Sequence, residues 1–420
     1  MSTLWTIGYA EIDISPRPGT QLCGYGFNSS RRSQVVRDPL LARCLFWKTG
    51  DTEALVIECD LLSMATRYAN EVRAAIAEAA AVPVEHVSIG CIHTHCGPGV
   101  GNDEYREDRL LPQLCEGARR ARAAAKPGYE LTYHTEYIEP IGFNRRAMDF
   151  SGIDNRLHTL FLTAPGEPEI VVWNYACHPV VFGPELHLSA DFPGEVNRRL
   201  REHGRIGIFL QGFAGDIDPV TNLNRWGKGD TADLATLGEL VSRRIEKSRR
   251  YAKPTGDAVF HASWKYIDLP MEVPASAAEI DAEVERVRHG TTAGAENYDT
   301  FLTEWAEIAK QVLPERQARP FVPQQPVMLF RFGSVRLLGL PGEVLTGYGL
   351  LFKKLYPGVV TWGLANGHAG YLPLKRDFED KQDYACYIIC KAYAAQRFPY
   401  LPTLEDVITN AVAEMFKEVE

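Results

Sequence analysis

The sequence lacks any long hydrophobic run. In its 420 residues, no window approaches eighteen consecutive apolar residues, whereas a membrane-spanning helix needs about 20. The N-terminal segment Met1–Pro16 also lacks the basic start and apolar centre of a secretory signal peptide. We therefore expect a soluble protein in the cytoplasm, without stable membrane association.

Paired cysteines and an excess of positive charge are also missing. The nine cysteines are odd in number, scattered and without a CxxC pair, which indicates small buried residues in a reducing compartment rather than a disulfide framework. The formal net charge of −9 argues against nucleic acid as a partner. No repeat, low-complexity tract or long linker divides the chain, so we expect one domain over residues 1–420. A homo-oligomer is left open.

Apolar segments that end in polar residues recur along the chain. Glu53–Asp60 and His86–Ile92 are predicted strands, and the alanine-rich segment Thr66–Ala80 between them has helical spacing. Further strands are predicted at Glu169–Ala176, Arg205–Gly212, Val335–Leu340 and Gly358–Ala365. This alternation predicts an α/β fold, a mixed β-sheet core covered by helices, which binds its ligands beyond the carboxyl ends of the strands.

Residues 275–323 break this pattern. Ser276–Gly290 and Asp299–Leu313 have the composition of two polar-faced helices, and we interpret the region as a helical insertion or cap against the site. The final segment, Thr403–Val419, is predicted to be a terminal helix packed on the body of the protein, with Thr403 as its N-cap.

Two histidines follow the second predicted strand, in the stretch HTHCGPG. In an extended backbone, residues two apart point to the same face, so His93 and His95 can both face one cavity. Two imidazoles there suit a metal site, or one metal ligand beside an acid or base. The alternative is a loop in which they only form hydrogen bonds. The turn Cys96–Gly99 would let the backbone approach a ligand closely.

Other polar residues at strand ends each have a structural explanation beside the functional one. His178 is either a hydrogen-bonded core histidine or a ligand, and Glu343 is either a first-turn helix glutamate or a ligand. Asp216 and Asp218, in the turn GDIDP, form an Asx-turn, hold a ligand histidine or bind a cation. Arg145 lies in a solvated loop or stabilises developing negative charge.

The order of the motifs resembles the neutral/alkaline non-lysosomal ceramidase family, which are zinc-dependent amidases. The motifs are, in order, AEIDISP, GYG, HTHCGPG, FNRR, ACHPV, SADFPG, GFAGDIDP, LPGE and NGHAGYLP. The resemblance extends from Ala10 to Tyr384 and implies the fold of the catalytic domain of that family.

The resemblance also implies a set of site residues. It implies a bound zinc ion (Zn2+) whose protein ligands are His93, His178, Glu343 and Tyr371. It implies catalytic roles for His95, Arg145 and Tyr384, although the spacing of Tyr384 differs from the family pattern by one residue. The sequence leaves the division of roles between His93 and His95 open. Without the resemblance, Tyr371 would be interpreted as an aromatic residue that covers a loop.

Two departures from the family pattern bear on function. Asp218 stands where the secreted ceramidases have a serine that is proposed as a nucleophile, so a covalent serine route is excluded at this position. We also expect the chain to lack the immunoglobulin-like C-terminal domain of the longer ceramidases, and we therefore expect a small soluble substrate.

The resulting expectation is a zinc-dependent hydrolase that cleaves an amide, or a related ester or lactone, by a metal-activated water. Three alternatives remain. The chain is a true ceramidase acting on N-acylsphingosine, an enzyme with Cys96 or Cys177 as its nucleophile, or a non-catalytic zinc-binding or scaffold protein.

Overall fold

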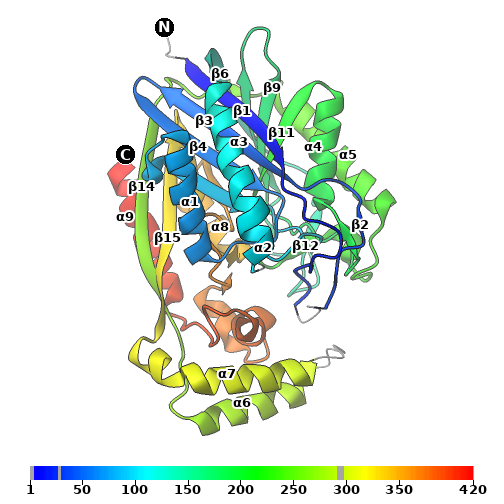
Figure 1. Ribbon diagram of the computed structural model, residues 1–420, viewed down its shortest axis with the longest axis vertical. Coiled ribbons are helices and arrows are strands. Elements are labelled where there is room, and N and C mark those ends of the chain that lie inside the picture. Colours follow the sequence, from blue (N-terminus) through cyan, green and yellow to red (C-terminus); the bar gives the residue numbers. More distant parts are fainter. Residues whose placement is uncertain (1–3, 27–29, 102, 291–297, 420) are drawn as a thin grey trace.

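The chain forms four layers, in the order helices, large sheet, small sheet, helices (Figure 1). The structure is a computed structural model that describes residues 4–26, 30–101, 103–290 and 298–419. The predicted α/β class with a mixed sheet core is confirmed. One face of the large sheet is covered by helices as expected, but the other is covered by a second sheet.

The large sheet is built mainly from the first half of the chain. Its strands are β1 (Trp5–Asp13), β3 (Leu41–Thr49), β4 (Thr52–Cys59), β5 (Val87–Cys91), β6 (Lys126–Tyr137), β8 (Arg156–Thr163), β9 (Glu169–Tyr175), β11 (Arg205–Gln211) and β13 (Lys253–Pro254). Their order is β11-β9-β8-β6-β1-β3-β4-β5, and β13 pairs with β6. The pairs β4–β5 and β9–β11 are parallel. With α1 (Thr66–Ala80), the strands β4 and β5 form the predicted β-α-β unit.

Both faces of the large sheet are apolar, which explains why both are covered. In β3, Ala42 and Cys44 pack in the core beneath the helices, whereas Leu45 and Trp47 pack in the core between the sheets. Successive side chains of a strand point to opposite faces, so this strand contributes to two cores. The helices of the outer layer are α1, α3 (Leu111–Ala123), α4 (Asp191–Glu202) and α5 (Thr231–Ser248).

The small sheet has the same two-sided character. Its strands, in spatial order, are β14 (Phe260–Pro270), β15 (Phe321–Phe332), β16 (Val335–Gly339) and β18 (Val359–Trp362). Met328 and Phe330 of β15 pack in the core shared with the large sheet. Val327 and Leu329 pack in the core shared with α8 (Thr346–Leu355) and α9 (Leu404–Val419). The predicted terminal helix is therefore confirmed as α9.

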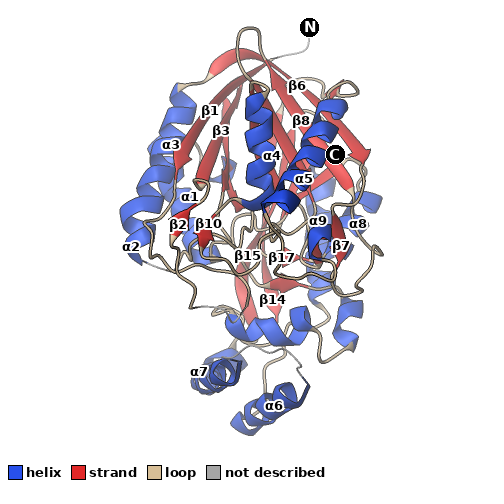
Figure 2. Cartoon of the chain, turned by 90° about the vertical axis from the view of Figure 1, so that its right-hand side faces the viewer, coloured by secondary structure: helices blue, strands red, loops and turns tan. Residues whose placement is uncertain are grey.

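Short elements gather at one end of the two sheets (Figure 2). Three two-stranded pairs are formed by β2 (Val35–Val36) with β10 (His187–Leu188), β7 (Gly142–Asn144) with β12 (Ile217–Pro219), and β17 (Glu343–Val344) with β19 (Tyr371–Leu372). The short helices at this end are α2 (Asp103–Tyr105), η2 (Arg106–Leu110), η3 (Val220–Asn222), η4 (Lys375–Glu379), η5 (Tyr384–Ile388) and η6 (Ile389–Ala392). The short helix η1 (Val84–His86) instead precedes β5, beside the start of β4.

A pair of helices lies at this same end of the molecule (Figure 1). They are α6 (Ala277–Gly290) and α7 (Tyr298–Ala318), which confirms the two predicted helices, while residues 291–297 between them lie outside the described residues. We call this pair the α6–α7 hairpin. It packs through Ile280 and Trp305 on Ile388 and Phe398. A role as a cap, and a single domain over residues 1–420, stay predictions.

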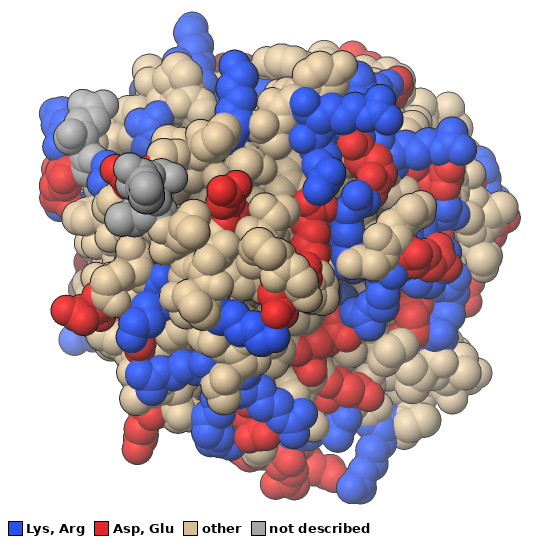
Figure 3. All heavy atoms as spheres, turned by 90° about the horizontal axis from the view of Figure 1, so that it is seen from above, with Lys and Arg blue, Asp and Glu red and all other residues tan. Residues whose placement is uncertain are grey.

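The opposite end of the molecule carries charges of both signs. Lysine, arginine, aspartate and glutamate side chains are interspersed on this face, without a large block of one sign (Figure 3). Among the helices of the described ranges, none combines the length and the apolar character needed to cross a membrane.

Candidate metal centre

Two histidines and a glutamate from distant parts of the chain meet beyond the strand ends. His93 follows β5, His178 follows β9, and Glu343 lies in β17. One ligand atom from each side chain lies within 4.8 Å of the other two, and all three residues are buried. Three of the four residues expected to hold zinc thus form one cluster.

Hydrogen bonds to carbonyl groups determine which nitrogen of each histidine faces the glutamate. Nδ1 of His93 lies 2.9 Å from the carbonyl oxygen of Leu62, and Nδ1 of His178 lies 2.7 Å from that of Ala214. A carbonyl oxygen only accepts, so each Nδ1 donates and Nε2 of a neutral ring carries a lone pair. Burial, together with the positive charge of Arg145, lowers the pKa of His178, so its ring is neutral near pH 7.

The three side chains therefore point acceptor atoms at one another. Oε2 of Glu343 lies 3.2 Å from Nε2 of His93 and 3.4 Å from Nε2 of His178. Among the described residues, Nε2 of His93 is buried without a hydrogen-bond partner. This set of donor atoms fits a divalent metal ion, and imidazole and carboxylate are ligands of zinc.

The cluster leaves little space. His93, His178 and Glu343 line a cavity of about 10 Å³, close to the volume that a single water molecule needs (about 10–15 Å³). Gly215 also lines it, and a Cβ atom there would lie 2.6 Å from the carbonyl oxygen of Glu343. The absence of a side chain at Gly215 allows the loop after β11 to approach β17.

The second carboxylate oxygen of Glu343 is held by side chains. Oε1 accepts a hydrogen bond from the hydroxyl of Tyr393 at 2.7 Å and lies 3.2 Å from Nε2 of His368. The rings of His368 and Tyr393 pack edge to face, with centroids 4.9 Å apart. Neither residue is among the site residues predicted from the sequence. His368 could have been found from its place in NGHAGYLP, whereas nothing in the sequence marks Tyr393.

Tyr371 lies next to Glu343 and is fixed by Arg145. The two strands β17 and β19 run parallel with Glu343 opposite Tyr371. The Tyr371 hydroxyl accepts from Nη2 of Arg145 at 2.7 Å, and Nη1 of Arg145 donates to Oδ1 of Asp218 at 3.1 Å. Burial raises the pKa of Tyr371 well above its ordinary value, and the charge of Arg145 offsets part of this rise. The role of Tyr371 as a metal ligand stays a prediction.

The two aspartates of GDIDP have different partners. Oδ1 of Asp216 accepts from the backbone N–H of Thr346 at 2.8 Å, at the first residue of α8, where helix N–H groups otherwise lack partners. Asp218 is buried and pairs with Arg145. His178 is held instead by the carbonyl oxygens of this segment, those of Ala214 and Ile217.

His95 lies beside the cluster of His93, His178 and Glu343. Its ring centroid is 4.8 Å from that of His93 and 5.9 Å from that of His178. Burial and the two neighbouring histidines lower its pKa well below the ordinary value, and its Nδ1 lies 3.0 Å from the carbonyl oxygen of His93. The premise of an extended segment was wrong, because His93 has a φ of 73°. The two rings nevertheless come together.

The GYG segment packs directly on His95. A Cβ atom at Gly24 would lie 2.5 Å from the His95 ring, and the ring of Tyr25 contacts that of His95 edge to face at 4.9 Å. Arg31 donates to the carbonyl oxygen of His95 at 3.0 Å. These contacts give the GYG motif a physical role in holding His95.

Tyr384 lies at the solvent side of the site. Its side chain is 42% exposed, and its ring centroid is 6.1 Å from that of Tyr371. A Cβ atom at Gly26 would lie 3.1 Å from the Tyr384 hydroxyl. Tyr384 therefore lies between solvent and Tyr371, and its predicted catalytic role stays a prediction.

The two cysteines considered as nucleophiles are poorly suited to that role. Cys96 and Cys177 are both buried in the core beneath the helices. Burial raises the pKa of each thiol above its ordinary value, whereas a nucleophilic cysteine needs a lowered pKa.

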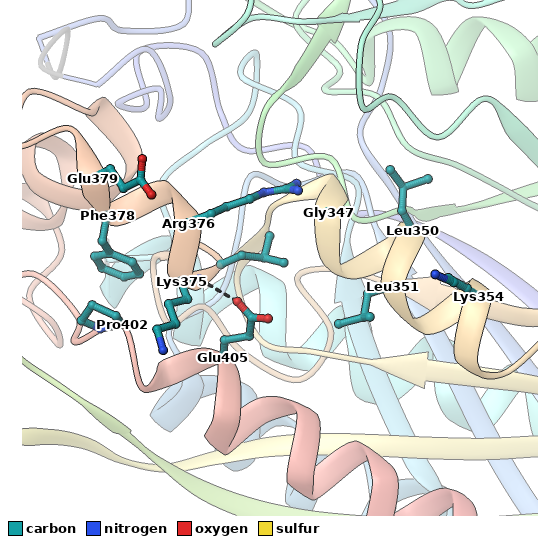
Figure 4. A pocket seen from close by; sticks show the side chains of 11 residues that line it. Gly347, Leu350, Leu351, Lys354, Lys375, Arg376, Phe378, Glu379, Pro402 and Glu405 are labelled. Atoms are coloured by element: carbon teal, nitrogen blue, oxygen red, sulfur yellow. Dashed lines mark hydrogen bonds between the residues drawn. The ribbon is translucent and has the colours of Figure 1, made fainter.

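A large surface groove lies away from the residues of this site. A groove of about 890 Å³ is lined by residues of α8, η4 and the start of α9, among them Leu350, Leu351, Lys354 and Phe378 (Figure 4). None of the predicted site residues lines it. The candidate site is therefore identified by the chemistry of its side chains, because the large groove lies elsewhere.

Fold and site together define an α/β protein with a candidate metal centre beyond its strand ends. No protein-family model matches the chain. The neutral ceramidase of Pseudomonas aeruginosa is 21% identical over 368 residues, which cover 70% of this chain. The chain spans 55% of the length of that relative. The resemblance inferred from the motifs is confirmed.

Two solved structures show the same fold. The crystal structure of the Pseudomonas aeruginosa neutral ceramidase matches with a TM-score of 0.70 and 17% identity, covering 99% of this chain and 75% of that one. A structure described as ceramidase complexed with C2 matches with a TM-score of 0.68 and 16% identity, covering 99% of this chain and 76% of that one. The chain thus shares the ceramidase fold.

Proposed function

We propose that the chain is a zinc-dependent hydrolase that cleaves the amide bond of an N-acyl amide. The observation that carries this proposal is the buried meeting of the Nε2 lone pairs of His93 and His178 with the carboxylate of Glu343. The likeness to neutral ceramidase supports an amide as the bond that is cleaved.

His93, His178 and Glu343 would hold the metal, with Tyr371 as a fourth ligand. When bound, zinc supplies Lewis-acid polarisation of a carbonyl group and lowers the pKa of water to about 7. The protein contributes ligands whose orientation is fixed by the carbonyl groups of Leu62 and Ala214.

His95 is the candidate proton carrier. Its Nδ1 is held by the carbonyl oxygen of His93, and its ring is neutral because its pKa is lowered. Nε2 is then free to take a proton from the attacking water and to pass it to the amide nitrogen as the C–N bond breaks. The products are a carboxylic acid, which keeps the oxygen of water, and an amine.

Arg145 and Tyr384 complete the proposed site. The Arg145 guanidinium is fixed by Asp218 and Tyr371, so its positive charge is in place before substrate binds. Such preorganised charge stabilises the oxyanion that develops on the carbonyl oxygen. The hydroxyl of Tyr384, a residue that is 42% exposed, is a second candidate donor to the substrate. Asp218 pairs with Arg145. This pairing supports a role for Asp218 in holding Arg145, in a mechanism that uses no serine nucleophile.

An assay of purified protein against N-acyl amides of short and long acyl chains, with matched esters and lactones, tests this proposal. We expect amide turnover that is abolished by a chelator and restored by zinc. The sequence favours a small soluble amide and the relatives favour ceramide, and the preferred chain length decides between them. Absence of turnover by protein with stoichiometric zinc would support the non-catalytic scaffold and overturn the proposal.

A further inference from the structure

The segment formed by residues 384–398 connects the α6–α7 hairpin to the metal centre. Nζ of Lys391 donates to Oε1 of Glu283 in α6 at 2.7 Å and lies 5.1 Å from the ring centroid of Trp305 in α7. Lys391 is only 1% exposed. Two residues later, the hydroxyl of Tyr393 donates to Oε1 of Glu343 at 2.7 Å.

The α6–α7 hairpin contacts this segment both before and after Tyr393. Before it, Ile388 packs in the same apolar cluster as the buried residues of α6 and α7. After it, Phe398 packs in that cluster, and Nε1 of Trp305 donates to the carbonyl oxygen of Arg397 at 2.9 Å. The segment is therefore anchored on the hairpin at both ends, with Tyr393 between the anchors.

The ring of Tyr393 is also confined on its own side. A Cβ atom at Gly370 would lie 2.9 Å from the Tyr393 ring, and Gly370 has a φ of 82° that favours glycine. The His368 ring packs edge to face against it. The backbone turns sharply after Tyr393, whose carbonyl oxygen accepts from the N–H groups of Gln396 and Arg397. These contacts hold the ring in the position from which its hydroxyl donates to Glu343.

We propose that Tyr393 is a positioning residue that fixes the carboxylate of Glu343, and that the α6–α7 hairpin fixes Tyr393 through Lys391 and its flanking contacts. The hairpin is then a brace for the metal centre. This inference rests on the proposed function, because it takes Glu343 as a metal ligand. It differs from a cap, since a cap controls access of substrate and leaves the affinity for metal unchanged.

Zinc affinity of the full-length protein, measured by competition with a chromophoric chelator, tests the role of Tyr393. Loss of a group that orients a metal ligand typically costs about 10- to 100-fold in affinity, and we expect this loss in Tyr393→Phe. The matched control is Tyr348→Phe, which removes a buried hydroxyl that donates to the carbonyl oxygen of Pro373 at 3.1 Å. We expect the control to keep the wild-type affinity.

A second pair of variants tests the hairpin. Glu283→Gln removes the charge that holds Lys391, and we expect a loss of about 2- to 10-fold in zinc affinity, on the scale of coupling through packed side chains. Glu285→Gln is the control, because Glu285 lies on the same helix, is 61% exposed and pairs with Arg288. If Tyr393→Phe fails to fold, the comparison of Glu283→Gln with Glu285→Gln still tests whether the hairpin affects zinc affinity.

The outcomes separate the inference from the proposed function. Failure of the wild-type protein to bind zinc would overturn the proposed function and the inference with it. Wild-type binding with equal affinity in Tyr393→Phe would overturn the inference alone. If Tyr393→Phe binds zinc more weakly while Glu283→Gln keeps the wild-type zinc affinity, the role of the α6–α7 hairpin as a brace would be overturned. A variant that lowers only the melting temperature of the metal-free protein, at unchanged zinc affinity, has a merely structural effect and also counts against the inference.

Discussion

The two histidines of the metal centre and its glutamate are held by different kinds of groups. His93 and His178 follow strands of the large sheet, and backbone carbonyl groups accept from their Nδ1 atoms. Glu343 lies in the two-residue strand β17, and its Oε1 is held by the side chains of Tyr393 and His368. The histidine half of the centre is therefore determined by the fold, whereas the glutamate half depends on individual side chains.

This difference predicts unequal sensitivity to substitution. Carbonyl groups cannot be removed by changing a side chain, so the orientation of the histidines should resist most substitutions around them. The carboxylate of Glu343 should respond to single changes in its surroundings.

Removal of a metal ligand should lower metal binding and activity equally for a histidine and for Glu343. We expect His93→Ala and Glu343→Ala to lose bound metal and to lower kcat/KM by on the order of a thousandfold, because a metal supplies several kcal/mol of transition-state stabilisation. Metal content by elemental analysis and steady-state kinetics measure this. The exposed His203, whose Nδ1 lies near a carbonyl oxygen of the same helix, gives the control His203→Ala. Stoichiometric metal in either ligand variant would contradict the assignment.

Removal of Arg145 should separate catalysis from metal binding. We expect Arg145→Met to lower kcat by about 100- to 1000-fold, the range for loss of an oxyanion-stabilising donor, while the metal content in saturating zinc is kept. The adjacent Arg146 pairs with Asp377 and Asp383, so Arg146→Met is a matched control and should keep most of the activity. Loss of metal in Arg145→Met would mean that this residue belongs to the framework of the site and not to its chemistry.

Substitutions of Asp218 test whether this residue acts through its ion pair with Arg145 or only occupies the position of a lost serine nucleophile. A hydrogen bond to a charged group contributes about 1.5–3 kcal/mol, so Asp218→Ser should lower kcat by about 10- to 100-fold. Asp218→Asn, which keeps an acceptor oxygen but not the charge, should fall between this variant and the wild type. An Asp218→Ser protein as active as the wild type, or more active, would show that the pair with Arg145 is dispensable.

A buried histidine of the large sheet should make stability depend on pH. Burial, with the nearby charge of Lys353, lowers the pKa of His158 well below its ordinary value. The unfolded chain takes up a proton near pH 6.5 while the folded one does not, so this contribution is complete above about pH 6.5 and is lost as the pH falls. The slope is at most about 1.4 kcal/mol per pH unit for one group.

Urea unfolding of the metal-free protein between pH 7 and pH 5 measures this slope. Below pH 6.5 the free energy of unfolding should fall less steeply in His158→Asn than in the wild type. Equal slopes would contradict the lowered pKa of His158. The His158→Asn protein should keep the wild-type activity above pH 7, because His158 lies in β8 and is not one of the proposed site residues.

Much of the fold could be predicted because the strands are compact apolar runs. The segments that became β4, β5, β9, β11, β16 and β18 were all identified from such runs. The position of the second sheet could not be predicted, because the apolar residues on a strand face show the same sequence pattern whether a helix or a sheet covers them. Leu45 and Trp47 gave no indication that they pack against β15 and β16.

The site could be predicted in part for a similar reason. His93, His178 and Glu343 carry chemistry at strand ends, where open sheets bind ligands. Tyr393 could not be found, because its partner lies 50 residues away in the chain and because a tyrosine in a short irregular segment has no distinguishing pattern. The pairing of Asp218 with Arg145 depends in the same way on two loops that only the fold brings together.

The central claim is that metal held by His93, His178 and Glu343 is required for amide hydrolysis. The most direct measurement compares zinc content and N-acyl amide turnover in protein as purified, after chelation and after zinc is added back. The account predicts stoichiometric zinc, loss of turnover with loss of metal, and recovery of both. Full turnover by protein without stoichiometric metal would contradict it.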